Sequence, residues 1–299
     1  MSSIRVNPFP MPNLLAALEQ LQQQTANTTL ELATGSSINK PSDNPAGAAE
    51  VVRLNAASSQ ADSFQTSIGS INGQFSTADS TLSTVVSTLQ SALSLGVEAA
   101  GGTLSTTDLA DVATELTGIQ SQLLNLANTS YQGQYIFAGT ATAQPFVLDP
   151  SQPSGVRYTG NTDTNKVTIG AGYQLQVNLP GSQVFGLGNA TGDVFQSLNN
   201  LITAVQNNTG IGTAVNGIDT ALGYVTTQRT FYDDGLNQAQ SQQTYLNSQS
   251  LSLSQQLNTV TAANVATLAS QLESEQTAQT ATLEAIGNTP QKSLFDYLT

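Results

Sequence analysis

Apolar residues recur every three or four positions along most of the chain, a spacing that places them on one face of an α-helix. The first such stripe predicts a helix near the N-terminus, with Asn13 as its N-cap. This stripe consists of Leu14, Leu18, Leu21, Thr25, Thr28 and Leu32. Its later positions are partly threonine, so its apolar surface is weak. Because an isolated helix of this length is marginal in water, we expect it to need a partner.

The stretch "TGSSINKPSDNPAGAAE" interrupts the helical pattern at residues 34–50. Gly35 can adopt the left-handed backbone conformation that ends a helix. Asp43 or Asn44 can cap the next helix, with Pro45 at its first position. The stretch is therefore predicted to be a defined connector between two helices. The connector residues are Gly35, Asn39, Pro41, Asp43, Asn44, Pro45 and Gly47.

Longer stripes predict a helical bundle in the middle of the chain. A second helix is expected to start near Ala46, and Thr107 or Asp108 to open a third after a glycine-containing turn. The stripes are Phe64, Ile68, Ile71, Phe75, Ala78, Leu82, Val85 and Leu89; Leu109, Val112, Leu116, Ile119, Leu123 and Leu126; and Ile211, Val215, Ile218, Leu222, Val225, Arg229, Tyr232, Leu236, Ala239, Gln243 and Leu246. Beyond them, Leu246, Leu257 and Leu268 are eleven residues apart, which predicts a nearly straight or slightly right-handed course.

Residues 131–190 differ in composition from the rest of the chain and are rich in Gly, Tyr, Val and Thr. Alternating apolar positions from Tyr173 to Leu179 predict a half-buried strand. The segment "TGNTDTN" at 159–165 is typical of a hairpin loop. We therefore expect a small β-rich insert between helical segments.

These elements are nested, because helical ends flank a helical middle that in turn flanks the insert. The predicted fold is mainly α: an elongated rod of paired long helices, with coiled-coil terminal arms, a helical bundle and a small β-rich insert. The predicted domains are an N-terminal arm at 1–45 with a C-terminal arm at 255–299, a bundle at 46–130 and 194–254, and an insert at 131–193.

The two arms combine weak apolar stripes with few charges. Arms of this kind suit a dense assembly, in which neighbouring molecules supply the contacts that order them. The candidate assembly residues are Leu14, Leu18, Leu21, Leu32, Leu253, Leu257, Leu268, Leu272, Leu283, Ile286, Leu294, Tyr297 and Leu298.

Composition narrows the chemistry that the chain can perform. Only 9% of residues are charged and the net charge is −13, so a basic nucleic-acid surface is not expected. The sequence contains neither cysteine nor histidine, which excludes Cys/His zinc sites and Cys–His or Ser–His–Asp nucleophiles. No run of 18 apolar residues predicts membrane insertion. Three prolines and a single arginine precede "LLAALEQL", so a cleaved signal peptide is not expected.

The remaining catalytic candidates are carboxylates, lysines and tyrosines. The acidic groups Asp108/Asp111/Glu115, Asp233/Asp234 and Glu273/Glu275 fit solvated helix faces better than a site, although the Asp233/Asp234 pair beside Gly235 could bind a cation. The glycine-bearing loops at 101–102 and 186–193 lack a phosphate-loop lysine. We therefore expect no enzyme and no cofactor.

Three segments resemble the bacterial flagellin family. "LATGSSINKPSDNPAGAAEVVRLNA" resembles the N-terminal helix–turn–helix segment of flagellins. "NTSYQGQYIFAGTATAQPF" at 128–146 is similar to a segment of the family's hook–filament junction proteins, and "SLFDYL" at 293–298 is similar to their C-terminal ending.

The resemblance implies a structural subunit of the extracellular flagellum that joins the hook side to the filament. It also implies export through a type III channel and assembly through the terminal helices. The implied partners are copies of itself in a ring, a neighbouring hook-associated protein, flagellin, and an export chaperone at the C-terminal arm.

Flagellin itself is the alternative. Flagellins usually carry an arginine-rich bundle, whereas Arg53 and Arg229 are the only arginines in these predicted helices. An unrelated coiled-coil adhesin or scaffold fits the matching chain ends and the connector less well, and an enzyme comes last.

Overall fold

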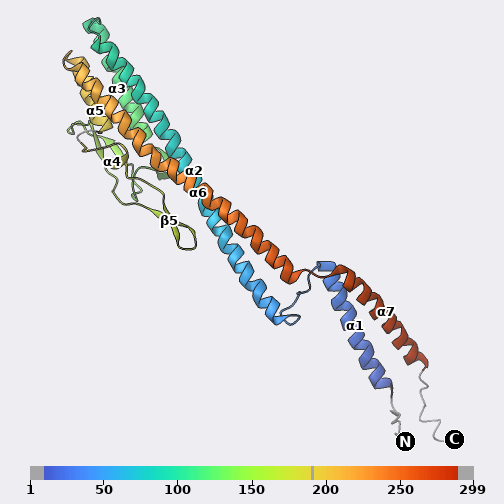
Figure 1. The fold of residues 1–299 in the computed structure, drawn as a ribbon. Helices are drawn as coiled ribbons and strands as arrows, with labels where there is room; N and C mark the ends of the chain where they lie inside the picture. Colours follow the sequence, from blue (N-terminus) through green and yellow to red (C-terminus); the bar gives the residue numbers. More distant parts are fainter. Residues whose placement is uncertain (1–9, 190–191, 289–299) are drawn as a thin grey trace, which may run out of the picture. The chain divides into compact units, whose positions relative to one another are not determined.

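The computed structural model describes residues 10–189 and 192–288. Figure 1 shows their long helices and short strands. The helices are α1 Pro10–Thr34, α2 Pro45–Ala100, α3 Thr106–Ala127, α4 Gly181–Val184, α5 Val194–Gln206, α6 Ile211–Thr261 and α7 Val265–Asn288. The strands are β1 Ser130–Tyr131, β2 Gln134–Tyr135, β3 Phe146–Leu148, β4 Val156–Tyr158, β5 Lys166–Gly170 and β6 Tyr173–Gln176. The fold is mainly α with a small β-rich insert, as the sequence predicted.

The chain divides into two compact units. The arm unit comprises residues 1–59 and 250–299, and the bundle unit comprises residues 60–249. Both boundaries fall inside long helices, so α2 and α6 contribute to each unit.

The core of the bundle unit is built from the predicted stripes. Ile68, Phe75, Leu82, Val85 and Leu89 on α2 are completely buried. The stripe of α3 is buried from its first to its fifth member, and its sixth is half-buried. On α6 every second member of the stripe is buried and the members between them are half-buried. These three helical predictions are confirmed.

An aromatic contact fixes how α2 packs on α6. Phe75 makes edge-on contacts with Phe231 and Tyr232 at centroid separations of 6.2 and 5.9 Å. A Cβ on Gly235 would lie 2.5 Å from the Phe75 ring, so the absence of a side chain there makes room for it. Arg229, a half-buried member of the stripe, donates to both carboxylate oxygens of Asp79 on α2.

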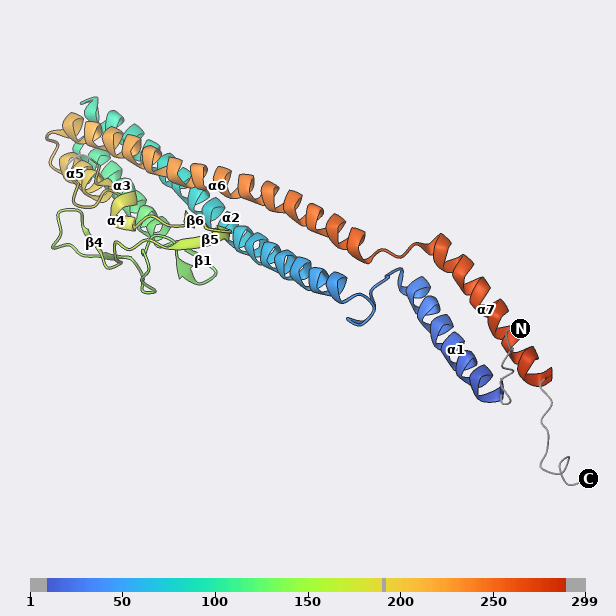
Figure 2. The ribbon, with the colours of Figure 1, turned by 60° about the horizontal axis from the view of Figure 1, so that its bottom comes forward.

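The β-rich insert forms three separate two-stranded antiparallel sheets, β1–β2, β3–β4 and β5–β6. Figure 2 labels β1, β4, β5 and β6. A cluster of buried aromatic rings joins the insert to the helices. The ring centroid of Phe146 lies 5.2 Å from that of Phe185 and 5.6 Å from that of Phe195 on α5. Phe137 contacts Phe185 at 5.4 Å. The insert therefore shares one continuous core with the bundle.

Two predictions for the insert are wrong in detail. Residues 159–165 are not a hairpin loop, because they connect β4 to β5, which lie in different sheets. Side-chain bonds hold this segment instead: Asn161 Oδ1 accepts from the backbone N–H of Thr140, and Asn178 Oδ1 accepts from that of Asn165. The alternation ending at Leu179 overextends the strand, which stops at Gln176.

Three helix boundaries also differ from the predictions. α1 begins at Pro10, so Asn13 lies inside the helix. The N-cap of α3 is Ser105, and Asp108 is its third helical residue, where the two close a reciprocal capping box. The predicted straight course beyond Leu246 is interrupted at residues 262–264, so Leu257 and Leu268 lie on different helices.

Candidate assembly surfaces

The connector between α1 and α2 is held by its own side chains. Gly35 takes a φ of +67°, the left-handed conformation predicted for the end of α1. Asp43 Oδ2 accepts from the backbone N–H groups of Asn39 and Lys40, at 3.0 and 2.7 Å. Asn39 Nδ2 in turn donates to the Ser36 carbonyl at 2.9 Å. These bonds close a defined turn in the predicted place.

The sequence offered either Asp43 or Asn44 as the N-cap of α2, and the structure shows which of them it is. Asn44 is the cap, because its Oδ1 accepts from the backbone N–H of Gly47 at 2.9 Å. Pro45 occupies the first helical position, as predicted, and Pro41 lies exposed in the turn. A Cβ on Gly47 would lie 2.6 Å from Ile38 Cδ1, so this glycine allows the connector to pack closely on α2.

The connector is joined to the break between α6 and α7, and we call this junction the clamp. The backbone N–H of Ser37 donates to the Thr261 carbonyl at 2.7 Å, and its hydroxyl donates to the same oxygen at 3.1 Å. The backbone N–H of Ala263 donates to the Gly35 carbonyl at 3.0 Å. Asn264 then caps α7 by accepting from the N–H of Thr267. Sequence reasoning missed this cap, although an asparagine before an amphipathic run was a usable signal.

α1 and α7 pack against one another in antiparallel directions within the arm unit (Figures 1 and 2). We call their contact the arm seam. It consists of Leu14, Leu18, Leu21, Thr25, Thr28 and Leu32 on α1, and Leu268, Leu272, Glu275, Gln279, Thr282 and Ile286 on α7, which are the half-buried and buried residues at 4,3 spacing. Apart from Leu268, the buried side chains of the seam are Thr28 and Glu275, which are polar.

The other predicted assembly residues have different environments. Leu253 and Leu257 are half-buried on α6, where Ser250 and Val260 complete a short stripe of the same spacing. Leu283 is 51% exposed and lies outside the seam. Leu294, Tyr297 and Leu298 lie outside the described residues. The structure therefore places most of the predicted leucines within contacts of the chain with itself, and leaves Leu283 free.

Large apolar side chains are exposed on the helices of the arm unit. They are Leu15 and Leu30 on α1, Val52 on α2, Leu251 on α6, and Val265 and Leu283 on α7. Charges are few around them, and the Arg53–Glu50 pair is the only ion pair in the described part of this unit. Hydrogen bonding by Arg53 lowers the pKa of Glu50. The surface is thus apolar and amide-rich, without a strong charge pattern.

The acidic residues and glycines that the sequence offered as candidate sites either have structural roles or do not gather into a site. Hydrogen bonding by the Ser105 side chain and backbone lowers the pKa of Asp108, in keeping with its capping role. Among the described residues, no group of three or more acidic side chains is arranged to hold a metal ion. Gly102 has a φ of +69° in the turn between α2 and α3. Gly235, beside the Asp233/Asp234 pair, is a packing site for Phe75.

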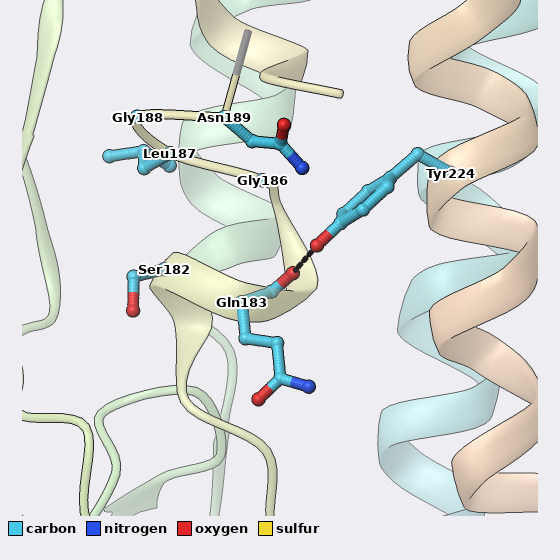
Figure 3. A pocket seen from close by; sticks show the side chains of 7 residues that line it. All are labelled: Ser182, Gln183, Gly186, Leu187, Gly188, Asn189 and Tyr224. Atoms are coloured by element: carbon cyan, nitrogen blue, oxygen red, sulfur yellow. Dashed lines mark hydrogen bonds between the residues drawn. The ribbon is translucent and has the colours of Figure 1, made fainter. Parts of the chain in front are cut away.

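An open depression of about 450 Å³ lies beside the loop after α4, and Figure 3 shows the residues that line it. Its described lining consists of Ser182, Gln183, Gly186, Leu187, Gly188, Asn189 and Tyr224. The Tyr224 hydroxyl donates to the Gln183 carbonyl at 2.8 Å, which ties α6 to α4. The described lining contains neither a carboxylate nor a basic side chain. In the described residues, no helix has both the length and the apolar character needed to cross a membrane.

Comparison with known proteins agrees with the motifs. Residues 10–142 match the bacterial flagellin N-terminal helical region. The chain is 34% identical over 157 residues to flagellar hook-associated protein 3 of Escherichia coli (strain K12), a match that covers 52% of this chain and 48% of that protein. The aligned part thus spans about half the length of this curated relative.

Solved structures show the same fold. A candidate flagellar hook-associated protein from Vibrio parahaemolyticus superposes with a TM-score of 0.67 at 19% identity, covering 73% of this chain and 99% of that one. The flagellar junction protein FlgL from Legionella pneumophila gives 0.59 at 15% identity, covering 70% and 100%. The chain is therefore similar to flagellar hook-associated protein 3, which confirms the resemblance indicated by its motifs, and its residues 10–142 match the flagellin N-terminal helical region.

Proposed function

We propose that this chain is a structural subunit of the bacterial flagellum, a junction protein that joins the hook to the flagellin filament. The observation that carries the proposal is the sequence match to hook-associated protein 3 over 157 residues. The arm unit supports it, because this unit exposes large apolar side chains and contains little apolar core of its own. Surfaces of that kind gain stability when neighbouring molecules cover them.

The proposal includes the steps that precede and follow assembly. The chain leaves the cell through the type III channel, with a chaperone on its C-terminal arm beforehand. Copies then form a ring between a neighbouring hook-associated protein and flagellin. In this proposal the arms mediate assembly, and the bundle and the insert form the body of the subunit.

Deletion of the gene tests the junction role. Cells without the protein should keep their hooks, lack filaments and release flagellin monomers into the medium. Restoring the gene on a plasmid should restore filaments. If the protein instead proves to be the bulk component of isolated filaments, it is a flagellin and the junction proposal is wrong.

A pair of exposed leucines tests whether assembly uses the arms. Leu283→Glu places a charge on the free face of α7, whereas Leu148→Glu places one on β3 of the bundle unit, at a residue that is 65% exposed. Neither change should alter the free energy of unfolding by more than about 0.5 kcal/mol. The Leu283 variant should be secreted without supporting filaments, and the Leu148 variant should leave motility intact. Equal behaviour of the two would remove the special role of the arms.

Truncation tests the same division at the level of the free protein. Removing residues 1–40 and 256–299 should leave a folded monomer by circular dichroism, because the continuous core lies in the bundle unit. Complete unfolding of the truncated chain would show that the arms are part of the folded body.

A further inference from the structure

A buried polar contact lies in the middle of the arm seam. Thr28 on α1 is 3% exposed and Glu275 on α7 is 7% exposed. The Thr28 hydroxyl donates to Glu275 Oε1 at 3.1 Å, and Gln271 Nε2 donates to the same oxygen at 2.9 Å. The second carboxylate oxygen, Oε2, is buried without a partner in the described structure.

This contact weakens the helix pair that contains it. The ion pairs of the described chain join Arg53 to Glu50, Arg157 to Asp149 and Arg229 to Asp79, so none of them balances Glu275. A buried carboxyl without a cation is usually less favourable than a well-packed apolar side chain of similar size. In coiled coils, however, one buried polar residue can specify the register of the helices at the expense of their stability.

The rest of the seam discriminates poorly between registers. On α1 the stripe repeats leucine and threonine at heptad spacing, so a slip of seven residues places Leu21 where Thr28 was. Leucine would pack there, and few charges flank the seam to oppose the slip. Glu275 would then lose its cross-helix donor while remaining buried. The carboxyl would keep only the bond from Gln271. Loss of a hydrogen bond by a buried carboxyl is unfavourable, and this penalty distinguishes the observed register from the slipped one.

We propose that Thr28 and Glu275 are the positioning pair that sets the register of α1 on α7. The clamp fixes only one end of the two helices, at Ser37 and Thr261, whereas the pair acts within the seam itself. The meaning of this register for assembly rests on the proposed function, but the register itself is a property of the isolated protein. A failure of the pair and a failure of the flagellar role can therefore be told apart.

Disulfide mapping in the purified full-length chain tests the proposal. The sequence has no cysteine, so introduced pairs are the only thiols. With Thr28 opposite Glu275 on antiparallel helices, Leu21 faces Thr282, and a slip of one heptad brings Leu14 to Thr282. The L21C/T282C pair therefore reports the observed register and the L14C/T282C pair reports the slipped one.

Glu275→Leu should raise cross-linking of the slipped pair at least several-fold over the same pair in the otherwise unchanged chain. Amide exchange in α1 and α7 should stay equal or become slower, since an apolar residue strengthens the seam. Glu275→Gln keeps an acceptor for Thr28 and should restore the original pattern. Gln279→Leu, which adds an apolar residue to the same stripe of α7 without touching the pair, should not raise the slipped signal.

Two results would overturn the proposal. If the slipped cross-link stays at its original level in Glu275→Leu, the clamp alone sets the register. If both cross-links disappear and exchange accelerates in α1 and α7, Glu275 supports the helix pair in an ordinary structural way. Both measurements are made on the monomer and do not depend on motility.

Discussion

The arm unit and the bundle unit share the same heptad spacing but differ in how much apolar surface their helices bury. In the bundle unit the stripes of α2, α3 and α6 are mostly apolar and many of their members are completely buried, and aromatic rings of α2 and α6 pack against one another. In the described part of the arm unit only two apolar side chains, Leu54 and Leu268, are buried, beside Thr28 and Glu275. Periodicity alone therefore predicts helices, whereas the chemistry at the repeated positions decides how strongly those helices hold together.

The largest expected difference is in the exchange of backbone amides. Segments with few buried apolar contacts open with lower free energies than core helices, which open only by global unfolding, about 5–15 kcal/mol. Since about 1.4 kcal/mol corresponds to a tenfold change, protection in α2 around Phe75 should exceed that in α1 by roughly three orders of magnitude or more. Hydrogen exchange measured by mass spectrometry on the dilute monomer checks this. Comparable protection of α1 and the bundle would abolish the contrast between the units.

Phe75→Ala should remove much of the stability of the bundle unit. The ring is completely buried between Phe231, Tyr232 and Gly235, so its loss leaves a cavity. Replacements of this kind lower the free energy of unfolding by about 3–5 kcal/mol. Leu268→Ala is the matched change in the arm seam and should leave the bundle transition in urea where it was. A shift of the bundle transition by both variants would show that the units unfold together.

Replacing two glycines of α6 by alanine should change the free energy of unfolding by smaller amounts and in opposite directions. Gly235→Ala forces a Cβ to within 2.5 Å of Phe75, and overpacking of a rigid core costs about 1–3 kcal/mol. At Gly223 nothing lies within 4 Å of the added Cβ, so Gly223→Ala should raise stability by about 0.5–1 kcal/mol through helix propensity alone. Urea unfolding of both variants measures the difference. Stabilisation by both would mean that Phe75 has room to move.

The helices of the bundle were predictable because each of their stripes has one dominant apolar face. The connector was predictable for a different reason: Gly35, Asn44 and Pro45 each perform a local task that needs no distant partner. The three-domain division and the assembly role of the arm leucines stay predictions.

The errors arose where the structure depends on contacts between distant residues. The segment at 159–165 looks like a hairpin loop, but it is held by Asn178 and by Tyr158, whose hydroxyl donates to the carbonyls of Phe137 and Asn161. The end of α6 shows neither proline nor glycine, and the break becomes intelligible only through its backbone bonds to Gly35 and Ser37. The prediction that Glu275 lies on a solvated helix face is wrong, because this residue is buried in the arm seam. The error arose because Glu275 interrupts the apolar pattern that sequence reasoning follows.

The smallest expected effect concerns Asp193, the N-cap of α5. Its Oδ1 accepts from the backbone N–H of Gln196 at 2.9 Å, yet the residue is only 5% exposed. Burial raises the pKa of this carboxyl, against the effect of the backbone N–H groups that donate to it. The folded state therefore holds the proton to higher pH than the unfolded state does. This contribution is fully present below the unfolded pKa and is lost as the pH rises through the raised folded value.

Asp193→Asn keeps an acceptor for the cap and removes the titration, so it should gain stability relative to the original protein as the pH rises from about 3 to 7. Asp193→Ala, the control, removes the cap and should lower the free energy of unfolding by about 0.5–2 kcal/mol. Urea unfolding of the three proteins at several pH values provides the measurement. A relative stability of Asp193→Asn that instead falls with rising pH would mean that the ionised carboxylate is favoured at this cap, as at an exposed helix N-terminus.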